Sequence, residues 1–408
     1  MEIVLERKSE TSSTVKKKSS VELFSGGGGL AIGFEQAGFH HHLLVENNRH
    51  ANQTIRTNIL RNADVFGHWN LFDGDVRSLA FADVCSSVQL VAGGPPCQPF
   101  SVGGKHRGQK DHRDLFPEAV RAVRELRPRA FVFENVRGLL RTKFASYFEY
   151  VILQLTYPEI VRNEQESVEE HLSRLERHHT SRNSSDLSYR VVYRMLNAAD
   201  YGVPQKRDRV FIVGFRSDLN TEWSFPPPTH DYDRLLWEKW ITGEYWDRHE
   251  VSRRLRPAPT PAEAARIKKL PRLDFGDYLL RWRTVRDAIS DLPEPRDNRH
   301  APEVLNHEFR PGARAYPGHT GSTFDDPAKT LKAGDHGVPG GENMLRYVDG
   351  RVRYFTVRES ARLQTFPDDY EFSGSWSEAM RQIGNAVPVT LAKTVADSVW
   401  EQLDQEGG

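Results

Sequence analysis

The sequence predicts an α/β fold in which a parallel sheet carries helices and a smaller second domain follows. Short apolar runs alternate with helix-like stretches from about residue 21 to residue 215, which is typical of strand–helix–strand units on a parallel sheet. The pattern ends at Pro226–Pro228, and the chain is then irregular and rich in Trp, Pro, Gly and Arg. A repeat of apolar residues at helical spacing closes the chain.

The composition is that of an ordinary folded protein. The chain has 408 residues, of which 38% are hydrophobic, so two or three domains fit. It contains no apolar stretch near the roughly 18 residues of a membrane span, and its first twenty residues lack the apolar core of a secretory signal, so we expect a cytoplasmic protein. Two cysteines, Cys85 and Cys97, exclude a disulfide scaffold and a multi-cysteine zinc site.

Five apolar runs are predicted to be strands of the sheet. They are Val21–Phe24, Leu43–Val45, Leu90–Ala92, Ala130–Phe133 and Val210–Val213. Residues 1–19 are polar and are expected to form a frayed tail. The closing helix is predicted from Leu391, Val395, Val399 and Leu403, with Pro388 near its start, where proline is tolerated.

Residues 159–190 interrupt the alternating pattern and are strongly charged. Asn163, with Glu166 three residues later, resembles a helix capping box. Val168, Leu172 and Leu175 then recur at helical spacing. We therefore expect an inserted, solvent-exposed helix followed by a mobile linker rich in Ser, Arg and Asn.

Four consecutive glycines, Gly26–Gly29, follow the first predicted strand, and a helix is expected over Leu30–Ala37. Glycine lets the backbone approach a ligand and take positive φ, and the helix start offers free N–H groups. Glu46 lies twenty residues after Gly26, where a partner of a ribose hydroxyl sits. Asp75 is placed to meet an adenine amino group. The pattern predicts an adenosine-like ligand; a dinucleotide and a plain tight turn stay open as alternatives.

Cys97 follows a turn of glycines and prolines, Gly93–Pro96, at the end of a predicted strand. Ligands bind at the carboxyl ends of strands in open α/β sheets, and a cysteine there can act as a nucleophile when its thiolate is favoured. The loop after it contains glycines and four basic residues, Lys105, Arg107, Lys110 and Arg113. Such a loop suggests closure over a polyanion. Cys85 has no comparable surroundings, so we expect it to be buried or incidental.

A carboxylate and two arginines follow or precede strands of the same sheet. Glu134 ends the strand Ala130–Phe133 and is expected to face the same cleft as Cys97, while Asn135 would hold the loop by hydrogen bonds. Arg207 and Arg209 are two residues apart, so in an extended segment they point the same way. We expect one to pair structurally and the other to reach a substrate; a surface salt bridge is the common alternative.

In their order along the chain, these residues resemble the cytosine-C5 DNA methyltransferases. The resemblance is carried by Phe24–Gly29, Pro95–Gln98, Glu134–Val136, Gln205–Arg209, Arg358–Gln364 with Phe366–Pro367, and Gly384–Val387. It implies a Rossmann-like S-adenosylmethionine-dependent methyltransferase domain formed by residues 20–215 and 353–408. Residues 216–352 would form a smaller target-recognition domain that binds DNA.

The resemblance also implies the site residues, with S-adenosylmethionine as cofactor and S-adenosylhomocysteine as product. By motif match the cofactor-binding residues are Phe24, Ser25, Gly26, Gly27, Gly28, Gly29, Glu46, Asp75, Val76, Pro96, Leu115, Asn385, Ala386 and Val387. The catalytic residues would be Cys97, Glu134, Arg207 and Arg209. Asn47 departs from the family, in which many members place a large side chain against the adenine, so we expect different packing on that face.

The implied chemistry is covalent catalysis on a cytosine flipped out of the duplex. Addition of the Cys97 thiolate to C6 makes C5 nucleophilic enough for methyl transfer. Glu134, near N3 and the exocyclic amine, would share a proton, which a raised pKa would favour. Arg209 would stabilise O2. This chemistry needs no metal, and we expect none.

The chain carries 56 Lys and Arg and 56 Asp and Glu, so its formal net charge is zero. A zero net charge argues against DNA binding only if the charges are evenly spread along the chain. Residues 251–286 hold ten basic against three acidic side chains, a basic stripe suited to phosphates; a solvated helix face is the alternative. The expected DNA contacts are Gln98, Ser101, Lys105, Arg107, Arg253, Arg254, Lys332 and His336.

Three other functions explain fewer of these residues. An RNA cytosine-C5 methyltransferase would need a second cysteine motif that this chain lacks, and a catalytically dead DNA-binding regulator would not need the intact Cys97, Glu134 and Arg209. A nicotinamide dehydrogenase explains the glycines and Glu46 only. We expect a monomeric bacterial or phage enzyme acting on double-stranded DNA without a membrane, with a cognate restriction endonuclease acting separately.

Overall fold

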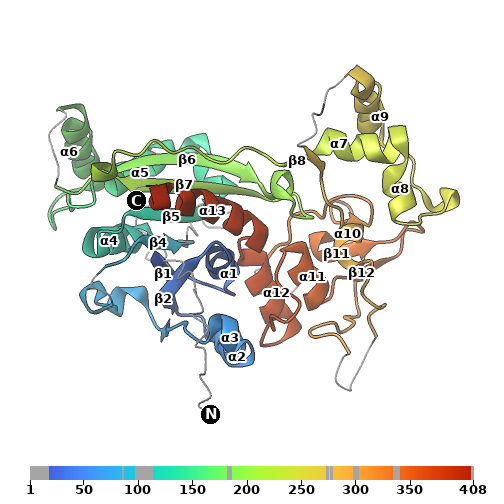
Figure 1. The fold of residues 1–408 in the computed structure, drawn as a ribbon, viewed down its shortest axis with the longest axis horizontal. Helices are drawn as coiled ribbons and strands as arrows, with labels where there is room; N and C mark the ends of the chain where they lie inside the picture. Colours follow the sequence, from blue (N-terminus) through green and yellow to red (C-terminus); the bar gives the residue numbers. More distant parts are fainter. Residues whose placement is uncertain are drawn as a thin grey trace, which may run out of the picture.

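A seven-stranded sheet lies at the centre of the larger part of the molecule (Figure 1), in the strand order β3-β2-β1-β4-β5-β7-β6. The structure is a computed structural model that describes residues 18–84, 87–96, 114–181, 186–272, 275, 279–296, 303–333 and 341–405. The strands are β1 (Lys18–Leu23), β2 (Phe39–Glu46), β3 (Leu71–Asp73), β4 (Leu90–Gly93), β5 (Ala130–Val136), β6 (Tyr189–Asn197) and β7 (Asp208–Arg216). Neighbouring strands are parallel, except that β7 is antiparallel to both β5 and β6.

Helices cover both faces of this sheet. α1 (Gly29–Gln36) and α13 (Val389–Gln405) pack on one face, and α4 (Phe116–Leu126) and α5 (Ala145–Thr156) pack on the other. The four apolar residues that predicted the closing helix are all buried: Leu391, Val395, Val399 and Leu403. A Cβ on Gly33 would lie 2.5 Å from that of Ala392, so glycine allows α1 to approach α13 this closely.

A second core joins the two ends of the chain. It packs α2 (Arg49–Arg61) and α3 (Ala63–Phe66) against α11 (Val357–Leu363) and α12 (Trp376–Asn385). The same core takes in α10 (Val285–Ile289) and Leu345 of β11 (Met344–Arg346), the middle strand of a small sheet with β10 (Ser322–Thr323) and β12 (Val352–Tyr354). Residues on both sides of position 353 therefore share one apolar cluster.

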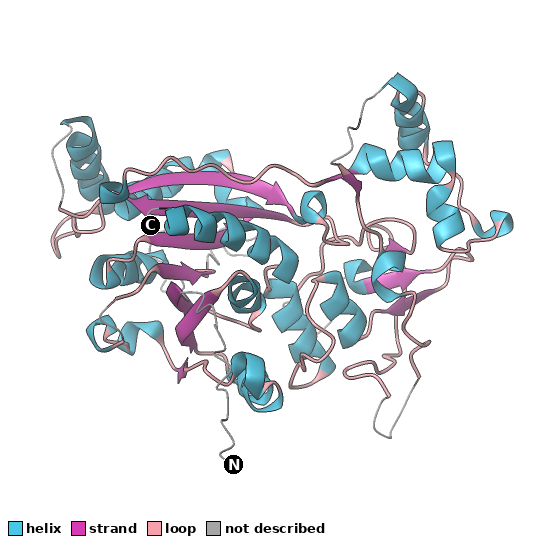
Figure 2. Cartoon of the chain, viewed as in Figure 1, coloured by secondary structure: helices cyan, strands magenta, loops and turns pink. Residues whose placement is uncertain are grey.

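The segment after the sheet forms a mainly helical arm, at the upper right of Figure 2. It contains β8 (His230–Asp231), α7 (Tyr232–Trp237), α8 (Glu244–Arg248), α9 (Pro261–Ile267) and β9 (Leu280–Arg281). Leu235, Tyr245 and Trp246 form a small core of its own. The buried Lys239 ties the arm to the second core, because its Nζ donates to the carbonyl of Asp325 at 2.9 Å.

The predicted insertion differs from expectation in its start, its burial and its end. Its helix, α6 (Val168–Ser181), is capped by Ser167 and Glu170, which exchange hydrogen bonds of 2.8 and 3.1 Å, and not by Asn163 with Glu166. The helix is not wholly solvent-exposed, because Leu175 is buried in a cluster with two side chains of α5. The segment also ends earlier than residue 190, since β6 begins at Tyr189.

Two further expectations need correction. The polar tail was placed over residues 1–19, but β1 begins at Lys18, whose ammonium group pairs with Asp404 at 2.8 Å and lies over the Trp400 ring. The sheet is also not entirely parallel, because β7 runs against its neighbours.

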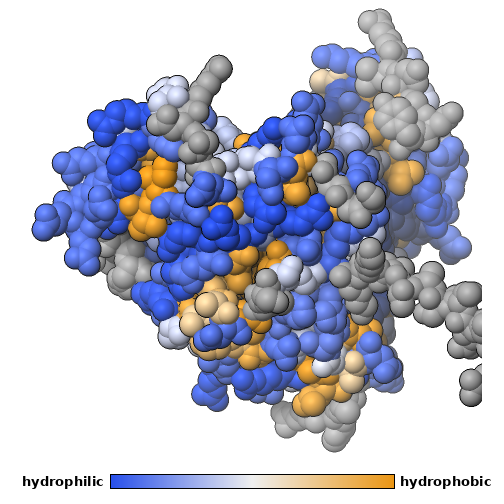
Figure 3. All heavy atoms as spheres, turned by 60° about the vertical axis from the view of Figure 1, so that its left-hand side comes forward, coloured by the Kyte–Doolittle hydropathy of each residue, from blue (hydrophilic) through white to orange (hydrophobic). Residues whose placement is uncertain are grey.

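The face of the molecule drawn in Figure 3 is largely hydrophilic, and its apolar side chains gather in small, separate patches. Among the described residues, no helix has both the length and the apolar character needed to cross a membrane.

Candidate active site

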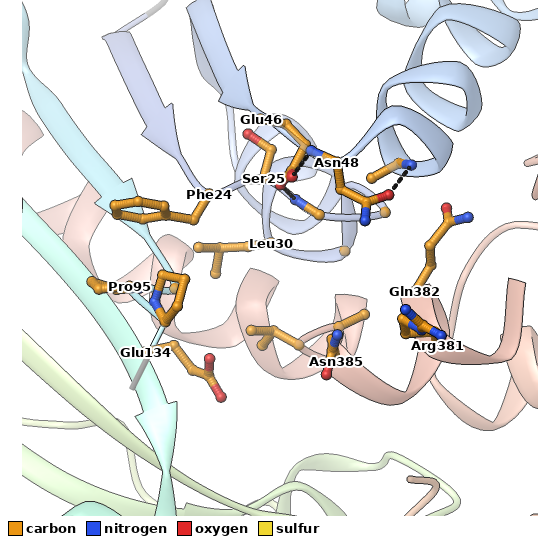
Figure 4. A pocket seen from close by; sticks show the side chains of 18 of the residues that line it. Phe24, Ser25, Leu30, Glu46, Asn48, Pro95, Glu134, Arg381, Gln382 and Asn385 are labelled. Atoms are coloured by element: carbon orange, nitrogen blue, oxygen red, sulfur yellow. Dashed lines mark hydrogen bonds between the residues drawn. The ribbon is translucent and has the colours of Figure 1, made fainter. Parts of the chain in front are cut away.

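A cavity of about 340 Å³ lies at the carboxyl ends of β1, β2, β4 and β5 (Figure 4). This is the edge at which open α/β sheets bind ligands. The predicted residues that line it are Phe24, Ser25, Gly26, Gly27, Gly29, Glu46, Pro96, Glu134, Asn385, Ala386 and Val387. The structure thus brings together residues that are up to 363 positions apart in the sequence.

The glycine turn forms one wall of the cavity. Gly26 has φ +53°, and a Cβ there would meet no atom within 4 Å, so the backbone faces open space. A Cβ on Gly29 would lie 2.4 Å from the carbonyl oxygen of Val387, so glycine is required where the turn meets the α12–α13 junction. Phe24 has φ 58°, which is a strained conformation for a residue with a side chain.

Glu46 connects the glycine turn to the end of β2. Its carboxylate accepts hydrogen bonds from the backbone N–H groups of Gly26 at 2.7 Å, Asn47 at 2.9 Å and Asn48 at 2.7 Å. Burial nevertheless raises the pKa of Glu46, and the three N–H groups oppose that effect. The side chain therefore holds the turn and presents a polar edge to the cavity at the same time.

Glu134 and Arg209 form a buried ion pair beside the cavity. The distance between Oε1 of Glu134 and Nε of Arg209 is 2.7 Å. They meet because β5 and β7 are antiparallel, with Val136 opposite Arg209 and Glu134 opposite Phe211, so the two side chains are diagonal neighbours. Burial raises the pKa of Glu134 although Arg209 lowers it, and burial lowers the pKa of Arg209.

Asn135 holds the turn that leads to Cys97. Its Nδ2 donates to the carbonyl oxygen of Pro95 at 2.9 Å, and Asn135 is itself buried in the end of β5. Pro95 and Pro96 both line the cavity. The expected hydrogen bond between the Glu134–Val136 motif and this turn is therefore present, and it fixes the chain immediately before Cys97.

Arg207, like Arg209, does not line the cavity, and its side chain has other partners than the Glu134 carboxyl group. Its guanidinium group donates to the carbonyl oxygens of Leu331 at 3.1 Å, Gly384 at 2.7 Å and Ala386 at 2.8 Å. The side chain is 1% exposed. Arg207 therefore positions the junction of α12 and α13. Of the two arginines, Arg209 is the one that pairs with the carboxyl group of Glu134.

Four predicted cofactor residues also lie outside the cavity lining. Asp75 is exposed at its carboxylate, which accepts from the side chain of Arg77 at 3.0 Å. Val76 is buried in the core, and Leu115 precedes α4. Gly28 turns away from the cavity, since a Cβ there would lie 2.7 Å from the hydroxyl of Tyr370.

The lining also includes residues that were not assigned to cofactor binding or catalysis, although Gly94, Pro95, Asn135 and Val136 belong to the predicted turn and motifs. They are Leu30, Asn48, Ala51, Gly94, Pro95, Asn135, Val136, Glu378, Arg381 and Gln382. Arg381 and Gln382 lie one helical turn before Gly384–Val387, so the spacing of that motif on α12 was the available signal. Asn48 caps α2 with its side chain and carries no motif of its own.

Five of the eight expected DNA contacts, Gln98, Ser101, Lys105, Arg107 and His336, lie outside the residues that the structure describes. The predicted nucleophile, Cys97, also lies outside them. Arg253 and Arg254 are exposed and form no ion pair with a described residue. Lys332 is exposed but pairs with Glu342 at 2.9 Å.

The basic stripe at 251–286 is less basic than its composition suggests. Four of its arginines form ion pairs with acidic residues that all lie outside the stripe: Arg256 with Asp247, Arg266 with Asp233, Arg281 with Asp287 and Arg286 with Asp325. Exposed Arg253 and Arg254 remain as candidates for phosphate contact.

Comparison with known proteins adds an independent line of evidence. The sequence profile of the C-5 cytosine-specific DNA methylase family matches residues 19–157 and 170–401. Type II methyltransferase M.PspPI of Psychrobacter sp. (strain TA137) is 33% identical over 395 residues, covering 95% of this chain and 80% of the relative. Type II methyltransferase M.NgoMIV of Neisseria gonorrhoeae is 31% identical over 392 residues, covering 95% and 99%.

Solved structures are similar in fold at lower identity. The Dnmt2 methyltransferase of S. pombe superposes with a TM-score of 0.52 at 16% identity, over 95% of this chain and 99% of that one. The methyltransferase EhMeth of Entamoeba histolytica gives a TM-score of 0.52 at 13% identity, over 95% and 99%.

Proposed function

This chain belongs to the C-5 cytosine-specific DNA methylase family, and on that premise we propose the reaction and the residues that perform it. The enzyme is a DNA (cytosine-5) methyltransferase that acts on C5 of a cytosine flipped out of a specific duplex sequence, through a covalent Cys97–C6 intermediate. The observation that carries the assignment is the buried Glu134–Arg209 pair, which lies beside a cavity lined by Pro96, the residue before Cys97.

The cavity fits S-adenosylmethionine in the chemistry of its walls. The open backbone at Gly26 lets a ligand approach closely. The carboxyl group of Glu46 can accept hydrogen bonds from hydroxyl groups of the ligand, and the side chain of Asn385 makes one end of the cavity polar. When bound, S-adenosylmethionine would supply the methyl group. Asp75 would join this set only if its pair with Arg77 opened.

The chain's own residues account for activation of the base. The Cys97 thiolate adds to C6 and leaves electron density at C5. Glu134 would hold N3 and the exocyclic amine, and its raised pKa favours the protonated form that can donate there. Arg209 would stabilise the negative charge that develops on O2, while also keeping Glu134 in place. After C5 has been methylated, water takes the C5 proton and the electron pair of that C–H bond re-forms the C5–C6 double bond as the Cys97 thiolate leaves C6.

We assign the reading of DNA to residues 216–352, and phosphate contact within them to Arg253 and Arg254. The relatives at about 30% identity are named Type II methyltransferases, which supports modification of a specific site in a restriction–modification system. In that setting the enzyme would work as a monomer in the cytoplasm, and its methyl group would protect host DNA from an endonuclease that acts separately.

Transfer of tritium from labelled S-adenosylmethionine tests this function. Duplex DNA and tRNA are offered in parallel to wild-type enzyme and to Cys97→Ala. We expect label in duplex DNA alone, none with Cys97→Ala, and unchanged binding of duplex DNA by that variant. Label in tRNA would favour the RNA enzyme, and undiminished turnover by Cys97→Ala would remove Cys97 as the nucleophile.

A further inference from the structure

Three metal-ligating side chains meet at the end of the sheet opposite the cavity. Glu35 comes from the last turn of α1, His40 from the start of β2, and His68 from the loop between α3 and β3. One ligating atom from each lies within 4.8 Å of those of the other two. The cavity lies at the first residue of α1 and the last residue of β2, so the cluster occupies the other ends of the same two elements.

The three side chains already contact one another. The distance between Nε2 of His68 and Oε2 of Glu35 is 2.9 Å. The rings of His40 and His68 are stacked, with centroids 4.1 Å apart and planes 13° from parallel. The side chains of Glu35 and His68 are 14% and 24% exposed, so an ion from solvent can reach them while the fold restrains their positions.

A buried neighbour orients the carboxylate. Nε1 of Trp69 donates to the same Oε2 of Glu35 at 3.0 Å, and Trp69 is 3% exposed. Ligands of metal ions are commonly fixed by such a second hydrogen bond, which leaves the remaining carboxylate oxygen free to turn toward the ion. Trp69 would therefore act as a positioning residue.

The ligand set determines which ion suits the cluster. Two imidazole nitrogens and one carboxylate oxygen favour zinc and its neighbours over magnesium or calcium, which prefer oxygen ligands alone. Zinc holds such ligands at about 2.0–2.2 Å. The ligating atoms are at most 4.8 Å apart, and the stacked rings of His40 and His68 would have to rotate so that their in-plane lone pairs converge on a shared ion.

Two further histidines, His41 and His42, lie near the cluster and differ in whether they could join it. His41 points into the core, where its ring nitrogens lie 3.0 Å from the hydroxyl of Ser20 and 3.0 Å from the carbonyl of Ala31, so it is already engaged. His42 lies edge-on to His40, with ring centroids 5.5 Å apart. The fourth position would be taken by His42 or by a water molecule.

We propose that Glu35, His40 and His68 form a structural binding site for a divalent transition-metal ion, Zn²⁺ in the first instance. The sequence predicts no metal, because the implied chemistry needs none, and its two cysteines exclude only a multi-cysteine site; these ligands are histidines and a carboxylate. A bound ion would join α1, β2 and the loop before β3, and so stabilise the folded chain. Since the site lies away from the cavity, the ion takes no part in methyl transfer.

Zinc binding to untagged, chelator-stripped protein tests the proposal, with calorimetry for stoichiometry and thermal unfolding for stability. Wild type should bind one Zn²⁺ saturably and gain thermal stability on binding. His68→Ala and His40→Asn should each lose both effects, while His179→Asn, at an exposed histidine on α6 that contacts Tyr157, should retain both. Co²⁺ in place of Zn²⁺ should give the visible absorption of a low-coordination site in wild type only.

Three outcomes would overturn the proposal. If wild-type protein shows no saturable Zn²⁺ binding, the proposed site does not exist. If His68→Ala and His40→Asn bind Zn²⁺ with wild-type stoichiometry and affinity, these histidines are not its ligands. Two independent ligand variants guard against a variant that fails to fold, because each is compared with its own metal-free melting temperature. Loss of methyl transfer on chelation, restored by Zn²⁺, would contradict the structural role; failure of methyl transfer in every sample bears on the proposed function instead.

Discussion

The guanidinium group of Arg209 lies against the carboxyl group of Glu134, with Nε 2.7 Å from Oε1, and neither side chain is more than 10% exposed. The register of β7 against β5 creates this contact, since it pairs Val136 with Arg209 and so places Arg209 diagonally to Glu134. Removing one partner from a buried pair leaves the other uncompensated. The two residues are therefore expected to act together in holding the target base.

Glu134→Gln should slow methyl transfer by about 10²–10⁴-fold, because it removes the group that shares a proton with the ring. Affinity for S-adenosylmethionine should change far less. Single-turnover rates and equilibrium cofactor binding separate the two effects, and Glu118→Gln, at an ion pair with Arg121 on α4 outside the cavity lining, serves as the control. Weakened cofactor binding with an unchanged rate would contradict this role.

The raised pKa of Glu134 also predicts the direction of a pH dependence. Burial keeps the carboxyl group protonated to higher pH than in a free glutamate, and the protonated form is the donor. The single-turnover rate should therefore fall as pH rises through that pKa, and Glu134→Gln should lack this decline. A decline that persists in Glu134→Gln would have to come from another group.

Glu22→Gln should stabilise the protein at high pH. Glu22 is fully buried in β1, and burial raises its pKa well above the usual range. The folded chain thus binds the proton more tightly than the unfolded chain, so this contribution to stability is present below about pH 4.3 and is lost as pH rises through the folded pKa. The melting temperature of Glu22→Gln should exceed that of wild type by more at pH 8 than at pH 5. Equal differences at both pH values would contradict this.

Arg207→Met should lower stability, because it removes the guanidinium donor to the carbonyl oxygens of Leu331, Gly384 and Ala386, of which Ala386 keeps only a long hydrogen bond from Gln364. Each buried carbonyl left unpaired costs about 1–3 kcal/mol. Urea unfolding should show this loss, while Arg137→Met, at an exposed ion pair with Asp208, should unfold like wild type. A variant as stable as wild type but inactive would return Arg207 to the catalytic residues.

Arg253→Ala and Arg254→Ala should weaken binding of duplex DNA and reduce its salt dependence. Each lost phosphate contact is expected to lower the slope of log K against log salt by about 0.9. Arg266→Ala is the matched control, because Arg266 belongs to the same stripe but pairs with Asp233. Equal losses from all three substitutions would mean that the stripe acts through its overall charge.

The sequence predicted the parts of the fold that have a local signature. Apolar runs gave β1, β2, β4, β5 and β7, since strands buried on both faces are continuously apolar. β6 was missed because it is the edge strand of the sheet, where Tyr193 and Met195 are 50% and 44% exposed and arginines interrupt the pattern. A half-exposed edge strand has no such run to recognise.

Contacts between distant segments could not be predicted in this way. The spacing of Arg207 and Arg209 indicates that they point the same way, but only the position of Gly384 and Ala386 shows which one is structural. The basic stripe likewise owes its ion pairs to partners such as Asp325, which lies 39 residues from Arg286. Charge counted along the sequence therefore overestimates the charge that is free on the folded surface.

Trapping of the covalent intermediate tests the central claim most directly. Bisulfite sequencing of methylated DNA first locates the target cytosine, and a duplex carrying 5-fluorocytosine at that position is then incubated with enzyme and S-adenosylmethionine. Fluorine at C5 cannot leave as a proton does, so elimination of the cysteine is blocked. We predict a complex that survives denaturation, whose digest carries the methylated base on the peptide containing Cys97 and which Cys97→Ala does not form. Methylation of ordinary DNA with no such adduct, or an adduct on another residue, would contradict the mechanism.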